Sequence, residues 1–164
     1  MMRKKVLYLH GLESGQGGPK VDFLTKNTYV LAPELDYTRS DIFSYLISLV
    51  EEFEPDYIIG SSMGGYSAFV LGALYNIPVL AFNPALHSRT LEPNFPKFVK
   101  QHIPTEFDVV LGDKDTVISG RHTLDYLKDH IKDKYVKYNI HNVKTMGHRV
   151  PIDVFCNMYN KIIN

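Results

Sequence analysis

A sharp turn from a buried strand into a helix is encoded at Gly60-Ser61-Ser62-Met63-Gly64-Gly65. The apolar run Tyr57-Ile58-Ile59 leads into this segment, and apolar residues at helical spacing follow it at once. The pattern is Gly-x-Ser-x-Gly centred on Ser62, and its glycines avoid the clash that side chains would cause where a strand folds straight back into a helix. Ser61 does not fit, because Ile59 and Met63 flank it at the same distance. The motif therefore requires a strand–turn–helix unit.

Strand-like and helix-like segments alternate along the rest of the chain. Apolar runs predict strands at residues 6–10, 29–32, 57–59, 78–82, 107–111 and 135–140. Helices are expected between them, one with Pro19 at its first position and one opened by a capping-box pattern at Thr38-Arg39-Ser40-Asp41. This alternation predicts an α/β fold, a three-layer α/β/α sandwich with about six mainly parallel strands. The length of 164 residues indicates one domain over residues 1–164.

One stretch interrupts the alternation. Residues 86–104 follow a strand and carry Leu91 and Phe95 among prolines and charged residues. An insertion after the carboxyl end of a strand suits a small lid or pocket wall. A surface helix with a long entry loop explains the same residues, and the two readings are compatible.

Composition excludes several classes of protein. Eighteen basic residues balance eighteen acidic ones, so global charge predicts neither nucleic-acid nor membrane binding. No stretch approaches the roughly 20 apolar residues of a membrane helix, and the apolar run behind the basic N-terminus is too short for a signal peptide. Cys156 is the only cysteine, which excludes a disulfide within the chain. We expect a cytoplasmic protein, and the sequence does not predict its oligomeric state.

A serine hydroxyl is a weak nucleophile, so Ser62 needs a base, and the base needs an acid that orients it. In open α/β sheets reactive groups gather just past the carboxyl ends of the strands. Asp115 follows the fifth predicted strand in the loop that Gly112 begins, and it is the preferred acid, with Asp113 as the alternative. His148 lies between the last strand and the last helix and is the candidate base. The order serine, aspartate, histidine is that of α/β-hydrolases.

Acyl transfer also needs donors for an oxyanion. The backbone N–H of Met63, which follows the nucleophile, and that of Leu12, in the loop after the first strand, are the candidates. His10 is expected to brace that loop through a side-chain hydrogen bond. The loop is rich in glycine, but it lacks the Gly-Lys-Ser/Thr of a phosphate-binding loop. No cluster has the spacing of metal ligands, so neither a cofactor nor a metal is predicted.

With these motifs the chain resembles the α/β-hydrolase superfamily and, within it, the small YqiA-like esterases. The matching segments are Leu7-Tyr8-Leu9-His10-Gly11, Gly60-Ser61-Ser62-Met63-Gly64-Gly65-Tyr66, Asn83-Pro84-Ala85 and Gly147-His148. The resemblance implies a compact hydrolase that cleaves esters or thioesters with Ser62, Asp115 and His148. The acid loop, Gly112-Asp113-Lys114-Asp115, is closer to the form of the wider superfamily than to that of the near family.

The expected partner is therefore a small acyl ester or thioester. Arg149 either meets an anionic group of that substrate or is an ordinary surface arginine. Two other functions stay open: a non-enzymatic interaction module on a hydrolase scaffold, and an acyltransferase that uses the same triad. Activity on generic esters separates the first alternative from hydrolysis, and product analysis with added alcohols or thiols separates the second.

Overall fold

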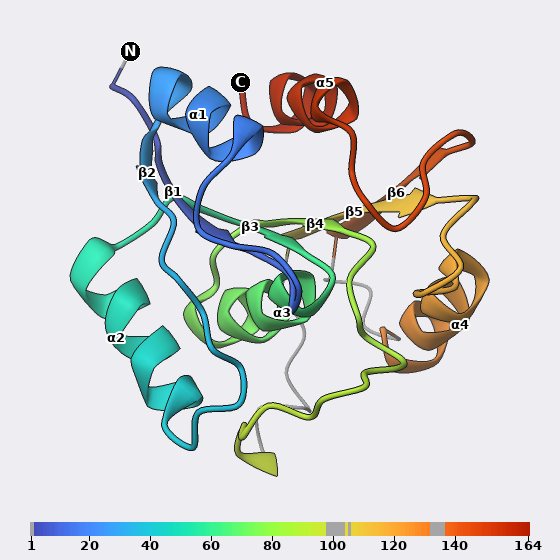
Figure 1. The fold of residues 1–164 in the computed structure, drawn as a ribbon, viewed down its shortest axis with the longest axis horizontal. Coiled ribbons are helices and arrows are strands. Elements are labelled where there is room, and N and C mark those ends of the chain that lie inside the picture. The colour runs from blue at the N-terminus through green and yellow to red at the C-terminus, as the bar shows by residue number, and fades with distance from the viewer. Residues whose placement is uncertain (1, 98–103, 105, 132–136) are drawn as a thin grey trace.

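The computed structural model describes residues 2–97, 104, 106–131 and 137–164 (Figure 1). Over these residues the chain forms six strands and five helices that alternate for most of its length. In chain order they are β1 (Lys5–Leu9), α1 (Pro19–Asn27), β2 (Tyr29–Leu31), α2 (Ile42–Phe53), β3 (Tyr57–Ser61), α3 (Met63–Tyr75), β4 (Val79–Phe82), β5 (Glu106–Gly112), α4 (Gly120–His130), β6 (Lys137–Val143) and α5 (Ile152–Ile162).

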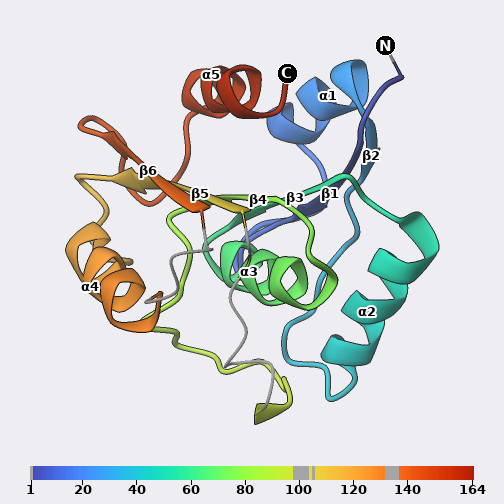
Figure 2. The same cartoon turned by 180° about the vertical axis from the view of Figure 1, so that it is seen from behind.

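The strands form one open sheet in the order β2-β1-β3-β4-β5-β6, and every neighbouring pair is parallel. Helices α1 and α5 lie side by side on one face of the sheet, and α2, α3 and α4 cover the other (Figures 1 and 2). The prediction of a three-layer α/β/α sandwich is confirmed.

The inner strands β1, β3 and β4 are largely apolar because both of their faces are buried. In β1, Leu7 and Leu9 join the core under α2, α3 and α4, whereas Val6 and Tyr8 join the core under α1 and α5. Successive side chains of a strand thus point into the two hydrophobic cores in turn.

The parallel register brings the carboxyl ends of the strands together. Leu9 pairs with Gly60, Gly60 with Ala81, and Phe82 with Val110. The residues that follow β1, β3, β4, β5 and β6 therefore meet along one edge of the sheet, where open α/β folds place their sites.

The capping box is wrong: α2 begins at Ile42, and the N–H and hydroxyl of Thr38 donate to the carboxylate of Asp36 at 2.9 and 2.6 Å. The Thr38 side chain is thus bonded within a local turn and does not accept a hydrogen bond from a helix N–H group.

Of the predicted lid at residues 86–104, residues 98–103 lie outside the described residues. In its described part, Phe95 packs on Tyr66 with ring centroids 5.7 Å apart.

No helix in the described part of the chain is long and apolar enough to cross a membrane.

Candidate functional site

Ser62 occupies the turn between β3 and α3. Its backbone has φ 54° and ψ −115°, a region that L-residues rarely adopt. The surrounding backbone holds it there: its N–H donates to the carbonyl of Phe82 at 3.0 Å, and its carbonyl accepts from Tyr66 and Ala85, both at 3.0 Å. The turn is thus fixed by β4 and its following loop as well as by its own helix.

The glycines of the motif make room for close backbone approaches. A Cβ on Gly60 would lie 2.1 Å from the carbonyl oxygen of Gly64, and one on Gly64 would lie 2.0 Å from that of Leu9. Both distances are far below van der Waals contact. The turn can therefore close on itself only because Gly60 has no side chain, and it can pack against β1 only because Gly64 has none.

A Gly64→Ala substitution is expected to lower the free energy of unfolding by about 3 kcal/mol or more, because the new methyl group meets rigid backbone rather than a movable side chain. Urea denaturation followed by circular dichroism measures the loss. Gly17→Ala is the matched control, since nothing lies within 4 Å of the Cβ it would add. A Gly64→Ala protein as stable as the parent would show that the elbow does not press on β1 as described.

The acid and base candidates meet in the structure. Oδ2 of Asp115 and Nδ1 of His148 lie 2.8 Å apart. The other oxygen of Asp115 accepts from the N–H groups of Val117 and Ile118 at 2.8 and 2.9 Å. The carboxylate is thereby held in one orientation, with 0% of its side chain exposed, whereas 31% of the His148 side chain reaches solvent.

The alternative acid is placed differently. The side chain of Asp113 is exposed, and its backbone N–H donates to the carbonyl of Val143 at 3.1 Å. It is Asp115, not Asp113, that contacts His148. Ser62 follows β3, which β4 separates from β5 in the sheet, and no hydrogen bond from its hydroxyl to His148 is formed among the described residues.

The acid loop and the histidine loop pack directly on each other. A Cβ on Gly112 would lie 2.3 Å from the carbonyl oxygen of Met146, and that same oxygen accepts from the N–H of Lys114 at 3.0 Å. The position of Gly112 therefore admits only glycine at this separation of the loops.

A residue without an assigned role in the sequence prediction joins these loops. Asn83 follows β4, is 1% exposed and has φ 42°. Its Nδ2 donates to the carbonyls of Gly147 and His148 at 2.9 and 3.2 Å, and its Oδ1 accepts from the N–H of Gly112 at 2.8 Å. The sequence signal is a polar residue, tolerant of positive φ, at the end of a buried strand.

The side chain of His10 holds the loop after β1 through hydrogen bonds, as predicted. This buried imidazole donates from Nδ1 to the carbonyl of Gly11 at 2.7 Å and accepts at Nε2 from the N–H of Leu35 at 2.9 Å. A Cβ on Gly11 would lie 3.4 Å from Cβ of Ser62, so the loop passes beside the elbow. Neither the N–H of Leu12 nor that of Met63 donates to a described residue outside the helices and strands.

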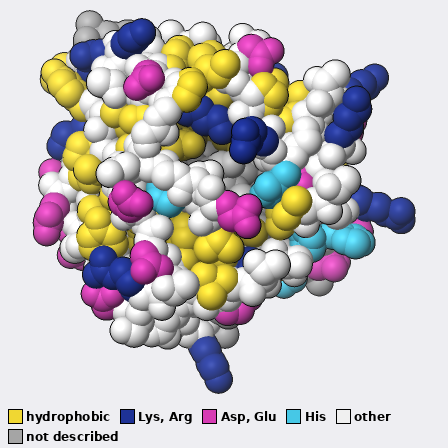
Figure 3. Space-filling model, in the orientation of Figure 1, with side chains coloured by type: hydrophobic (Ala, Val, Ile, Leu, Met, Phe, Trp, Pro, Cys, Tyr) yellow, Lys and Arg dark blue, Asp and Glu magenta, His cyan; other side chains and the backbone are white. Residues whose placement is uncertain are grey.

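The surface over this region is hollowed. Figure 3 shows a depression near the middle of the face that carries the loop after β1, with a histidine at its edge and basic side chains together beside it. The strand ends thus open to solvent rather than into a closed core.

A family model described as "Uncharacterised protein family (UPF0227)" matches residues 5–102, more than half of the chain. The chain belongs to UPF0227. The matched region includes β1, the elbow and Asn83, and the suspected relationship to the YqiA-like family is confirmed.

Solved structures show the same fold as this UPF0227 chain. One is a Xanthomonas campestris protein assigned to the alpha/beta hydrolase superfamily, with 18% identity, a TM-score of 0.65 and coverage of 99% of this chain and 100% of that one. An alpha-beta serine hydrolase homologue from Coxiella burnetii has 12% identity, a TM-score of 0.68 and coverage of 99% and 86%. A Paleococcus ferrophilus monoacylglycerol lipase has 17% identity, a TM-score of 0.65 and coverage of 88% and 86%. The fold is that of the α/β-hydrolases.

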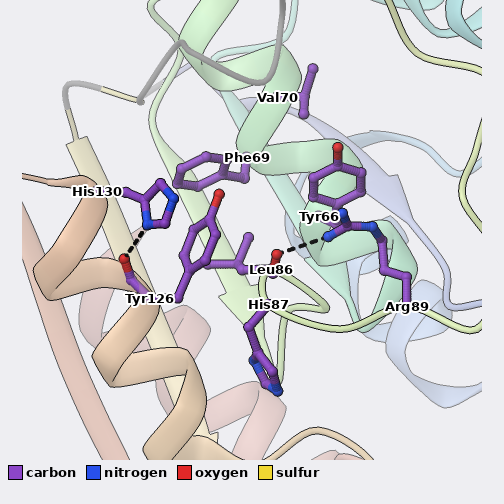
Figure 4. A pocket seen from close by; sticks show the side chains of 8 residues that line it. All are labelled: Tyr66, Phe69, Val70, Leu86, His87, Arg89, Tyr126 and His130. Atoms are coloured by element: carbon purple, nitrogen blue, oxygen red, sulfur yellow. Dashed lines mark hydrogen bonds between the residues drawn. The ribbon is translucent and has the colours of Figure 1, made fainter. Parts of the chain in front are cut away.

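A separate cavity of about 290 Å³ lies between α3, α4 and the segment after β4 (Figure 4). Its lining residues are Tyr66, Phe69, Val70, Leu86, His87, Arg89, Tyr126 and His130. The guanidinium of Arg89 stacks 3.9 Å from the centre of the Tyr66 ring and donates to the carbonyls of Ala85 and Leu86. These contacts stiffen the segment after β4, and neither Ser62, Asp115 nor His148 lines this cavity.

The described residues of this UPF0227 protein contain no group of three or more His, Cys, Asp or Glu side chains that could hold a metal ion.

Proposed function

We propose that this protein is a serine hydrolase that cleaves small carboxylic esters or thioesters through Ser62, His148 and Asp115. The observation that carries the proposal is the buried Asp115 carboxylate bonded to Nδ1 of His148 at 2.8 Å. An ionised carboxylate only accepts hydrogen bonds, so it fixes the proton of the neutral imidazole on Nδ1. Nε2 is then left as the basic nitrogen, as acyl transfer by a serine requires.

The proposed reaction has two halves. His148 takes the Ser62 hydroxyl proton on Nε2 while Oγ attacks the acyl carbon, and it then gives that proton to the leaving oxygen or sulfur as the bond to the acyl group breaks. Water attacks the acyl-serine, His148 takes a proton from that water, and the proton returns to Oγ as the carboxylic acid leaves. Asp115 stays ionised and stabilises the imidazolium in both halves.

The negative charge that develops on the carbonyl oxygen needs donors that are already in place. The N–H groups of Met63 and Leu12 fill this role in the proposal. Met63 begins α3, so the positive end of the helix dipole adds to its N–H. The loop after β1, which carries Leu12, passes beside Ser62 at Gly11.

The substrate is expected to be small. Apart from residues 86–104, the sequence has no large insertion between its strands and helices that could form a cap or an extended binding surface. Structural neighbours with the same fold include an esterase and a monoacylglycerol lipase, which supports ester chemistry.

The first test is labelling with a fluorophosphonate, which reacts with activated serines, followed by mass spectrometry of the modified peptide. We expect one adduct on Ser62 that is absent from a Ser62→Ala protein. A folded sample that takes up no label would overturn the proposal and favour an interaction module on a hydrolase scaffold. Products formed with added alcohols or thiols would reveal acyl transfer in place of hydrolysis.

Asn83 offers a test of how the site is positioned. Asn83→Gly keeps the positive φ accessible but removes the amide that joins Gly112 to Gly147 and His148. We expect kcat to fall by about 10²-fold, since a displacement of about 1 Å costs that much in a well-aligned site. Stability should fall by about 1–3 kcal/mol, because buried backbone groups lose their partner.

Steady-state kinetics and urea denaturation measure both effects. Asn76→Gly is the matched control, because Asn76 also has positive φ, at 54°, but caps the far end of α3. An Asn83→Gly enzyme with unchanged kcat would remove Asn83 from the positioning of the histidine loop.

A further inference from the structure

Lys20 lies where a cation is costly. It is the second residue of α1, and its side chain is half-buried. The positive end of a helix dipole disfavours a cation in the first turn. Burial, followed by the nearby positive charge of Arg149, lowers the pKa of the Lys20 ammonium. Three separate electrostatic costs therefore fall on one side chain.

Its contacts place the ammonium against α5, the helix that follows the loop of His148. Nζ of Lys20 lies 5.9 Å from the centre of the Phe155 ring on α5. Phe155 is buried and stacks on Phe82, the last residue of β4, with ring centroids 5.2 Å apart. Arg149 directly follows His148 in the loop that leads into α5. In Figure 3 basic side chains lie together at the edge of the depression.

No acidic side chain balances these cations in the described part of the chain. Neither Lys20 nor Arg149 forms an ion pair or a side-chain hydrogen bond with another described residue. Asp22 is nearest to Lys20 in sequence and Asp153 is nearest to Arg149, but both aspartates are exposed and neither pairs with Lys20 or Arg149. By contrast, the surface arginine Arg39 is paired with Asp41 at 2.7 Å. Two adjacent cations without a carboxylate match an anionic ligand better than they match a structural role.

We propose that Lys20 and Arg149 bind a negatively charged group, a carboxylate or a phosphate, on the alcohol or thiol part of the substrate. This inference rests on the proposed function for its orientation. His148 must protonate the leaving group, so the leaving group lies against His148 and its neighbour Arg149. The anion would offset the repulsion between the cations and the unfavourable end of the helix dipole.

The test measures binding without turnover. Ser62→Ala protein is titrated by NMR with 4-butyryloxybenzoate, its neutral methyl ester and monophenyl glutarate, which carries its charge on the acyl part. We expect the first ligand to bind on the order of tenfold more tightly than the methyl ester, and Lys20→Met or Arg149→Met to remove that difference. Lys26→Met, at the other end of the same helix, is the matched control and should leave it unchanged.

Added salt should weaken the preference, because it screens the partly exposed charges. Equal affinity for the charged ester and its methyl ester overturns the proposal, and so does a preference that survives both substitutions. A preference for monophenyl glutarate alone overturns the assignment to the leaving group. Because these titrations need no catalysis, loss of the anion site and failure of fluorophosphonate labelling are separate results.

Thermal unfolding gives a second readout. Lys20→Met should raise Tm at neutral pH, because the folded state no longer holds a desolvated ammonium. The folded pKa of Lys20 is lowered, so its cost is complete below that pKa and vanishes above the unfolded pKa. The gain in Tm should therefore shrink as the pH rises into the alkaline range. A lower Tm for Lys20→Met at neutral pH would indicate a structural lysine and overturn the assignment.

Discussion

Replacement of Ser62 by alanine is expected to lower the turnover of a phenyl or nitrophenyl ester by about 10⁶-fold, as loss of the nucleophile does in comparable triads. The oxyanion donors and the substrate contacts stay in place, so a small residual rate over water should remain. The variant should fold normally, because the backbone contacts of Ser62 with Phe82, Tyr66 and Ala85 do not use its hydroxyl. Burst and steady-state kinetics measure the loss, and circular dichroism reports the fold.

The neighbouring serine is a close control. Ser61 belongs to the same dipeptide and is the last residue of β3, but it lies outside the Gly-x-Ser-x-Gly frame. Ser61→Ala should keep the parent activity. If Ser61→Ala were inactive and Ser62→Ala active, the frame of the elbow would be shifted by one residue and the proposed mechanism would be wrong.

The second large effect concerns the acid. Asp115→Asn should lower kcat by about 10⁴-fold with little change in fold, as disabling the acid does in serine proteases. An asparagine retains an oxygen for the N–H groups of Val117 and Ile118, now at 2.8 and 2.9 Å from the carboxylate. It then presents an amide to Nδ1 of His148, so the imidazole carries its proton on the wrong nitrogen and loses the charge that stabilises its cation.

Asp113→Asn is the paired control, since its exposed side chain lies in the same loop. It should keep most of the activity. Activity lost in Asp113→Asn and kept in Asp115→Asn would show that the assignment of Asp115 as the acid is wrong. Comparable losses in both variants would point to the net charge of the loop rather than to one acid.

Short-range patterns carried most of the sequence prediction. The Gly-x-Ser-x-Gly frame fixes a turn because the clashes at Gly60 and Gly64 arise within a few residues and against the adjoining strand. The parallel sheet followed from apolar runs that alternate with helical segments. The wrong capping box shows the limit of such patterns: Asp36, two residues before Thr38, competes for the same hydroxyl.

Long-range contacts were beyond the sequence. The bonds of Asn83 to Gly112 and His148 span 29 and 65 residues, and no local pattern encodes them. The approach of Lys20 to Phe155 depends likewise on how α1 packs beside α5. Asp115 and Asp113 were both compatible with the loop, and only the folded loop shows which carboxylate faces His148.

The strand order has a consequence for how the molecule opens. β6 pairs with β5 alone, and all of its residues are exposed or half-buried, whereas β3 and β4 lie inside the sheet. Local unfolding begins where few apolar contacts hold an element. Local unfolding of β6 would displace the loop that carries His148, whereas Ser62 would stay on the folded central strands. The nucleophile and its base thus stand on central and outer parts of the sheet, and the amide of Asn83 is one of the bonds that hold the histidine loop in place.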